Sequence, residues 1–176
     1  MRRWILSTIL VLSSFSQVFA GYEDTLLFSK GYWTVELTYN TDENSYWCSA
    51  KTANRRSQEF SVTAFENGTI VVFIFDNRWS LAKRPVRFLI DIDYSRWQID
   101  GTADDIAVSI ALSNNEKAGK FITELAQGSA VALFNMEERR LATFSLKGSR
   151  AALTELIDCW RKISVTDPFR TSTDPF

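Results

Sequence analysis

The stretch LATFSLKGSRAALTELIDCW, residues 141–160, decides the fold that we predict for this chain. Apolar and polar side chains alternate as far as Lys147, which is the pattern of a strand with one buried face. Gly148 interrupts that pattern, and the hydroxyl of Ser149 can cap the free amides at the start of a helix. Apolar residues then recur at three- and four-residue spacing, so the helix has one apolar face. The stretch therefore predicts a strand followed by a helix that packs on the core.

The two cysteines of the chain predict a disulfide. Cys159 lies beside the apolar face of the last predicted helix, and Cys48 is the only other cysteine. Two cysteines in an exported chain usually pair with each other, although two buried free thiols are the alternative. A bridge over so long a loop stabilises the folded chain by about 4 to 5 kcal/mol through loop entropy. We therefore expect the disulfide to tie an early strand to the last helix.

The first twenty residues have the pattern of a secretory signal peptide. Arg2 and Arg3 supply the positive start, residues 4–12 are mostly apolar, and small or compact residues precede a cleavage point after Ala20. The apolar run is shorter than the roughly 20 residues that a stable membrane span needs. We therefore predict a periplasmic or secreted protein with no stable membrane span after cleavage.

Composition after cleavage fits a single domain with a mildly acidic surface. Removal of residues 1–20 leaves 156 of the 176 residues, and the loss of two arginines changes the net charge from −1 to −3. A chain of this length can bury a sizeable core as one domain. A nucleic-acid-binding surface needs a clustered basic excess, so we predict no nucleic-acid partner.

Alternating and fully apolar runs across residues 21–112 predict about seven strands in a mainly antiparallel arrangement. Turn signals at Asn67-Gly68 and Asp100-Gly101 separate some of these strands. A helix over 118–126 and a strand over 130–136 precede the opening stretch. The predicted fold class is α+β: a mainly antiparallel β-sheet or a small sandwich, two helices in the C-terminal half, and one disulfide.

The predicted domain boundaries follow from where the apolar pattern begins and ends. We expect a signal peptide at 1–20, a single exported α+β domain at 21–163, and a mobile tail at 164–176. The tail carries the tetrapeptide TDPF twice, at 166–169 and at 173–176, without an apolar periodicity.

The residue types exclude most of the common hydrolase mechanisms. The chain has no histidine, which removes Ser-His-Asp and Cys-His arrangements and imidazole metal sites. If both cysteines are bonded together, no thiolate nucleophile remains. A glycine-rich phosphate loop is also missing from the sequence. We therefore predict no catalytic residues, no cofactor and no metal site, and favour a protein that is not an enzyme.

Two carboxylates keep a hydrolase interpretation open. Asp91 and Asp93 belong to one alternating run, which predicts that they share a strand face about 7 Å apart. Paired carboxylates at such a spacing hydrolyse glycosidic bonds. The simpler interpretation is that both residues lie on the solvent face of an antiparallel sheet.

Aromatic and basic residues near these aspartates favour a binding surface. Trp79 and Trp97 lie in or beside predicted connections, where an aromatic ring can stack on a glycan or anchor a protein partner. Filling the core is the alternative role for both rings. Nearby arginines can pair with anionic ligands or with the aspartates themselves. The candidate contact residues are Trp79, Arg84, Arg87, Asp91, Asp93, Arg96 and Trp97.

Two short segments resemble a known family. Trp33-Thr34-Val35 begins a predicted strand, Cys48 follows soon after, and the late segment from Phe144 to Leu153 has the sequence FSLKGSRAAL. Together with the signal peptide, this pattern resembles the small exported proteins of alphaproteobacteria typified by the invasion-associated locus B family. The resemblance implies a periplasmic or surface-associated β-rich domain that is linked with host-cell entry or envelope function.

The leading functional prediction is an exported, non-catalytic binding protein that acts in the cell envelope or in host interaction. Its expected partner is an envelope protein, a host protein or an envelope glycan. The first alternative is a glycan hydrolase that depends on carboxylates. The second is a periplasmic inhibitor of another protein, with a rigid projecting loop at 55–58 or 78–84.

Overall fold

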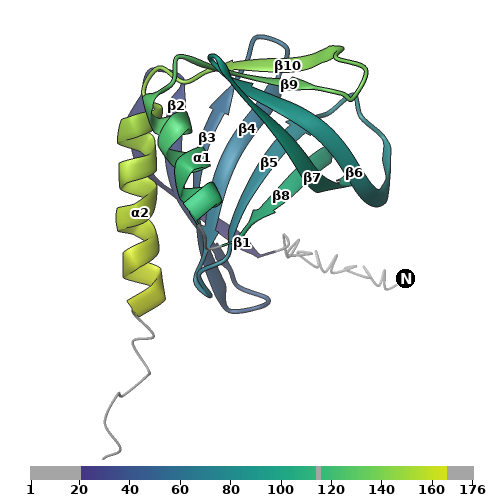
Figure 1. Cartoon of the computed structure of the whole chain (residues 1–176). Helices are drawn as coiled ribbons and strands as arrows, with labels where there is room; N and C mark the ends of the chain where they lie inside the picture. The colour runs from purple at the N-terminus through teal and green to yellow at the C-terminus, as the bar shows by residue number, and fades with distance from the viewer. Residues whose placement is uncertain (1–20, 114–115, 166–176) are drawn as a thin grey trace, which may run out of the picture.

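The computed structural model describes residues 21–113 and 116–165. Ten strands form one antiparallel sheet in the order β1-β2-β3-β4-β5-β8-β7-β6-β9-β10, with two helices beside one another (Figure 1). The strands are β1 (Tyr22–Lys30), β2 (Trp33–Asn40), β3 (Ser45–Ala53), β4 (Gln58–Phe65), β5 (Ile70–Asp76), β6 (Leu81–Ile92), β7 (Ser95–Asp105), β8 (Ala107–Leu112), β9 (Ala130–Phe134) and β10 (Arg140–Ser145). The helices are α1 (Glu116–Gln127) and α2 (Ser149–Val165). The prediction of a mainly antiparallel sheet with two helices in the C-terminal half is confirmed.

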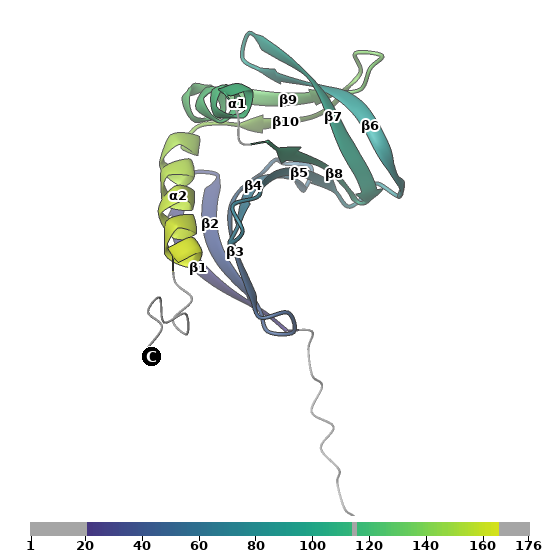
Figure 2. The ribbon, with the colours of Figure 1, turned by 60° about the horizontal axis from the view of Figure 1, so that its bottom comes forward.

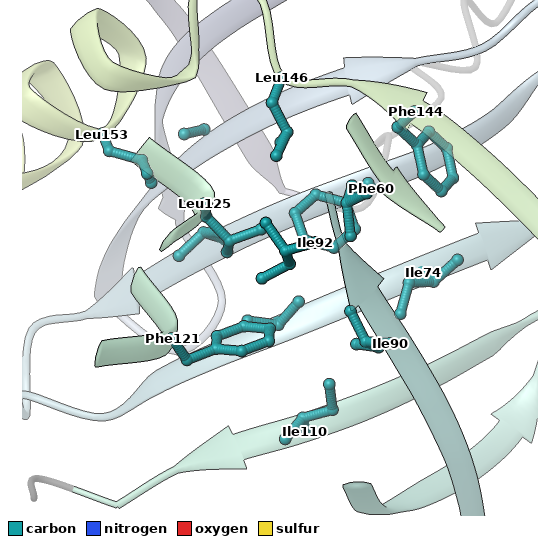
Figure 3. Close-up of a cluster of buried hydrophobic side chains, with 14 of the residues drawn as sticks. Phe60, Ile74, Ile90, Ile92, Ile110, Phe121, Leu125, Phe144, Leu146 and Leu153 are labelled. Atoms are coloured by element: carbon teal, nitrogen blue, oxygen red, sulfur yellow. The ribbon is translucent and has the colours of Figure 1, made fainter. Parts of the chain in front are cut away.

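The core lies between one face of the sheet and the two helices. Residues in register across neighbouring strands present apolar side chains to this face, because side chains alternate along each strand. One such row consists of Val35, Ala50, Val62, Val72 and Ile110. Figure 3 shows buried side chains from the sheet meeting those of both helices, among them Phe60, Ile90, Phe121, Leu125 and Leu153. The alternating pattern in the sequence therefore corresponds to a single contiguous core.

The predicted disulfide between Cys48 and Cys159 is confirmed. It joins β3 to α2 across 111 residues of chain, and both cysteines are buried. The predicted cap at the start of α2 is wrong, however, because the Ser149 hydroxyl donates to the carbonyl oxygen of Leu125 at 2.7 Å. The amide of Ala152 instead donates to the carbonyl oxygen of Gly148. Ser149 thus ties the start of α2 to α1.

We expect loss of the Cys48–Cys159 bridge to lower the free energy of unfolding by about 4 kcal/mol, because the unfolded chain regains the entropy of a long closed loop. The measurement is urea unfolding of the oxidised protein, the reduced protein and a double variant with alanine at both positions. Equal midpoints for all three would contradict the expectation.

The outer edge of β10 is closed by side chains. Trp33 Nε1 donates to the carbonyl oxygen of Ser145, and Asn54 Nδ2 donates to that of Thr143, each at 3.1 Å. Gln58 Nε2 donates to the carbonyl oxygen of Leu141, also at 3.1 Å. These three carbonyls lie two residues apart, so they point to the same edge, away from β9. The sheet therefore curls until its last strand meets β2 and the start of β4.

A buried carboxylate supports this closure. Asp76 is only 2% exposed, and it accepts hydrogen bonds from Gln58 Nε2 at 2.7 Å and from Arg78 Nε at 2.8 Å. The side-chain hydrogen bonds from Arg78 hold the pKa of the Asp76 carboxyl far below its ordinary value, although burial opposes them. The charged carboxylate thus orients Gln58, which in turn reaches β10.

The lowered pKa of Asp76 predicts that the protein loses stability in acid. The unfolded chain takes up a proton at Asp76 more readily than the folded chain does, so this contribution is present at neutral pH and is lost progressively below about pH 5. We expect Asp76→Asn to cost about 2 kcal/mol at pH 7 and to flatten the fall in stability towards pH 3. Urea unfolding across this pH range tests it, with Asp42→Asn in an exposed turn as the control. An unchanged acid dependence in Asp76→Asn would contradict the prediction.

Two boundaries differ from the sequence-based prediction. Asp100-Gly101 is not a turn but lies inside β7, and the turn that precedes β7 is at Asp93-Tyr94. β6 begins at Leu81, so Pro85 lies within the strand. Proline is tolerated there because β9 pairs with β6 only from Leu89 onward, so the proline nitrogen faces no neighbouring strand.

Parts of the prediction concern residues outside the described chain. The signal peptide at 1–20 lies there, as do residues 166–176 of the predicted tail, while α2 continues to Val165. Within the described residues, neither helix has the length and apolar character that crossing a membrane would require.

Candidate binding groove between β7, β8 and α1

The groove arises where the β7–β8 ladder stops. A two-residue turn joins the strands, which pair only at Asp104–Ala107, Ala103–Val108 and Thr102–Ser109. Continued in the same register beyond Thr102, the ladder would include a pair between Asp100 and Ala111 and a pair between Gln98 and Ser113. Neither pair forms, and all four of these residues line a groove of about 240 Å³. Figure 2 shows β7 and β8 diverging from their shared turn.

Gly101 lies where β7 approaches β8 most closely before the ladder ends. A Cβ atom at Gly101 would lie 2.5 Å from the carbonyl oxygen of Ser109 and 2.9 Å from Cε1 of Phe88. Only a residue without a side chain permits this close approach. From Gly101 to Ser95, β7 remains paired with β6 and leaves β8. The glycine that suggests a turn in the sequence therefore allows a close approach of two chain segments inside a strand.

Contacts with α1 hold β7 on its side of the groove. The Trp97 ring packs edge-on against Phe121 with centroids 5.3 Å apart, and its Nε1 donates to Glu124 at 2.7 Å. The ammonium of Lys120 lies 5.9 Å from the centre of the same ring. Trp97 is consequently only 9% exposed. It fixes the wall of the groove and presents little ring surface to a ligand.

Gly101→Ala should destabilise the protein by about 2 kcal/mol, because the added methyl group must displace main-chain atoms. The matched control is Gly119→Ala on α1, where a Cβ would meet nothing within 4 Å, and this change should stabilise the helix by up to about 1 kcal/mol. Thermal and urea unfolding measure both effects. Similar changes in unfolding free energy for Gly101→Ala and Gly119→Ala would contradict the close packing at Gly101.

The groove combines an apolar floor with a polar rim. The floor is formed by Ile99, Ile110, Leu112 and Phe121, and the rim by Gln98, Asp100, Ser113 and Lys117. A concave apolar surface with a few polar groups at its margin is the usual composition of a binding site. The arrangement suits burial of an apolar group beside polar contacts.

Main-chain groups of β7 also face the groove. The turn between β6 and β7 is flanked by the pair Ile92–Ser95, so the odd-numbered residues of β7 bond to β6. The other end agrees, because the pair Asp104–Ala107 flanks the turn between β7 and β8, so the even-numbered residues of β7 are the ones whose main-chain groups face β8. The N–H and C=O groups of Gln98 and Asp100 therefore point away from β6 and into the groove.

The rim carries one acidic residue, Asp100, and one basic residue, Lys117. Asp100 accepts a hydrogen bond from Arg87 Nε at 2.7 Å, which offsets its charge. Lys117 forms no ion pair with any residue in the described part of the chain. An anionic group on a ligand would therefore be favoured near Lys117.

The structure separates the two aspartates of the hydrolase interpretation. Arg96 binds Asp91 through Nε at 2.8 Å and Nη2 at 2.9 Å, and it also reaches Glu138 at 3.1 Å. The side-chain hydrogen bonds from Arg96 lower the pKa of the Asp91 carboxyl. Asp91 is thus one partner in an ion pair on the face of the sheet opposite the core.

Asp93 has a different and local role. It lies in the turn after β6 with a φ of 50°, and its carboxylate accepts hydrogen bonds from the amides of Ser129 at 2.9 Å and Ala130 at 3.0 Å. The prediction that it shares a strand face with Asp91 is wrong, because the strand ends at Ile92. The two carboxylates do not converge on a common cleft, and only Asp93 lines the small pocket beside the turn.

The other candidate contact residues are dispersed. Trp79 is half-buried and packs against the core, in the connection between β5 and β6. Arg84 is exposed and bonds to the carbonyl oxygen of Ala82, while Arg87 pairs with Asp100 near the rim. Of the seven candidates, Trp97 alone lines the groove.

The two segments proposed as projecting inhibitory loops are part of the sheet or adjoin it closely. Gln58 begins β4 and is buried, and Asn54 accepts hydrogen bonds from the amides of Arg56 and Gln58. Leu81 begins β6, so the second segment runs into a strand.

Sequence reasoning missed most of the groove. Gln98, Ala111 and Lys117 carry no motif, and their proximity depends on a ladder that ends early. The available signal was Gly101 within an otherwise alternating run, which indicates either a turn or a close backbone approach.

In the described chain, no group of three or more metal-ligating side chains could hold a metal ion. Comparisons with protein families, with curated proteins and with solved structures find no match to this chain.

Proposed function

We propose that this chain is an exported, non-catalytic binding protein that acts in the cell envelope or in host interaction and holds its ligand in the groove between β7, β8 and α1. The observation that carries the proposal is the interrupted ladder. The missing pairs, among them Asp100–Ala111 and Gln98–Ser113, leave main-chain groups beside the apolar floor of a groove of about 240 Å³. Such a surface gains free energy when a ligand buries the floor and completes the hydrogen bonds.

The engagement of the carboxylates supports binding over catalysis. Asp91 is held by Arg96, Asp93 accepts main-chain hydrogen bonds, and Asp76 is buried against Arg78. A catalytic acid or base needs a carboxyl group that can approach the substrate. These three carboxylates instead hold parts of the fold together.

The disulfide supports a location outside the cytoplasm. Bridges such as Cys48–Cys159 form and persist in oxidising compartments. The two segments that resemble the invasion-associated locus B family also meet in space, where Trp33 Nε1 donates to the carbonyl oxygen of Ser145. An envelope or host partner is therefore the favoured ligand class.

A photo-crosslinking amino acid at Gln98, used in intact cells that export the chain, tests the proposal. The expected result is a cross-linked product at Gln98 that is missing at the control position Ala82, an exposed residue of β6 outside the groove. Mass spectrometry then distinguishes a polypeptide from a glycan. No product at Gln98, or the same product at both positions, would overturn the proposed site.

A further inference from the structure

We infer that the groove takes an extended polypeptide segment, which pairs through its main chain with β7 and places an apolar side chain on the floor. This inference rests on the proposed function, because it specifies the ligand of the same groove. Peptide binding by strand addition requires an open strand edge and a pocket for alternate side chains. Both features are present where β7 leaves β8.

The first argument is the main chain of β7. The N–H and C=O groups of Gln98 and Asp100 face the groove, and the ladder that would satisfy them ends at Thr102. Ala111 of β8 stands in the corresponding position on the opposite wall. An added strand can therefore replace hydrogen bonds that the fold itself leaves open.

The second argument is that the outer edges of the sheet are less suited to strand addition. The edge of β10 already accepts hydrogen bonds from Trp33, Asn54 and Gln58. The edge strand β1 has a register irregularity between Leu26 and Phe28, and irregularities of this kind disfavour pairing with another chain. The edge inside the groove has a regular register and a wall on each side.

The third argument is the shape and charge of the groove. Alternate side chains of an extended segment point to one side, so one apolar side chain can cover Ile99 and Ile110 while its neighbours remain in solvent. An acidic neighbour would lie near Lys117, since Arg87 already offsets Asp100. The preferred segment thus carries an apolar residue beside an acidic one.

A glycan fits the same surface less well. Sugar rings bind by stacking on exposed aromatic faces. Trp97 is the ring best placed to do so, but it is packed against Phe121 and bonded to Glu124. The groove therefore favours main-chain recognition over ring stacking.

The experiment selects ten-residue peptides from a random displayed library on the disulfide-bonded protein and measures their affinity for four variants. Gln98→Pro removes the N–H that faces the groove, and Gln98→Ala removes only the side chain. Ala111→Trp fills the groove, and Ala82→Trp adds the same bulk at an exposed position elsewhere. We expect Gln98→Pro to bind at least tenfold more weakly than Gln98→Ala, and Ala111→Trp to bind at least tenfold more weakly than Ala82→Trp, which should change binding less than twofold.

A second measurement uses the unaltered protein, so that it does not depend on the folding of Gln98→Pro. Hydrogen exchange at the amides of Gln98, Asp100 and Ala111 should slow at least tenfold when a selected peptide binds. N-methylation of alternate peptide amides should abolish that protection. The inference would be overturned if no peptide can be selected. It would also be overturned if neither Gln98→Pro nor N-methylation of the peptide changes the affinity of binding.

The two proposals fail in different ways. A glycan cross-linked at Gln98 in cells would overturn strand addition and leave the groove as the binding site. The lack of any cross-link at Gln98 would overturn the binding site itself, whatever the peptide library yields.

Discussion

The outer edge of β10 is the constraint on which the rest of the structure depends. A strand at the end of a sheet has a row of main-chain groups without partners, and leaving such groups buried and unpaired costs roughly 1 to 3 kcal/mol each. Here side-chain donors from Trp33, Asn54 and Gln58 take alternate carbonyls along that edge. Asp76 holds Gln58 in place from behind. Because these bonds bring β10 to β2 and β4, a single open sheet encloses one core together with its two helices (Figure 3).

Closure at β10 also determines where the sheet opens. The strands β7, β6, β9 and β10 are joined to the other six through this closure at one end and through three β7–β8 pairs at the other. Since β7 stays with β6 and Trp97 is held by α1, β7 departs from β8 beyond Thr102. The opening therefore lies directly above the apolar core, which is why its floor consists of core-facing side chains such as Ile99 and Ile110.

Three aspartates in the described part of the chain stabilise the fold. Asp91, Asp93 and Asp76 are each occupied, by Arg96, by main-chain amides and by Arg78. If the groove binds an extended segment, as we propose, the free energy of binding comes from apolar area and from main-chain hydrogen bonds.

The sequence by itself predicted a mainly antiparallel sheet, the two helices and the disulfide. Alternation records which face of each strand is buried, and with only two cysteines a single pairing exists, so both features can be recognised locally. The tertiary structure alone decided that β8 pairs with β5, that Asp93 lies in a turn, and that Gly101 allows a close approach to Ser109 and Phe88 instead of ending a strand. It also decided the groove, because the number of pairs between β7 and β8 depends on contacts with β6 and α1 that are distant in sequence. Local sequence patterns indicate which side chains of each segment are buried. The residue at which the β7–β8 ladder ends depends instead on contacts of β7 with β6 and α1, and only the folded chain brings these elements together.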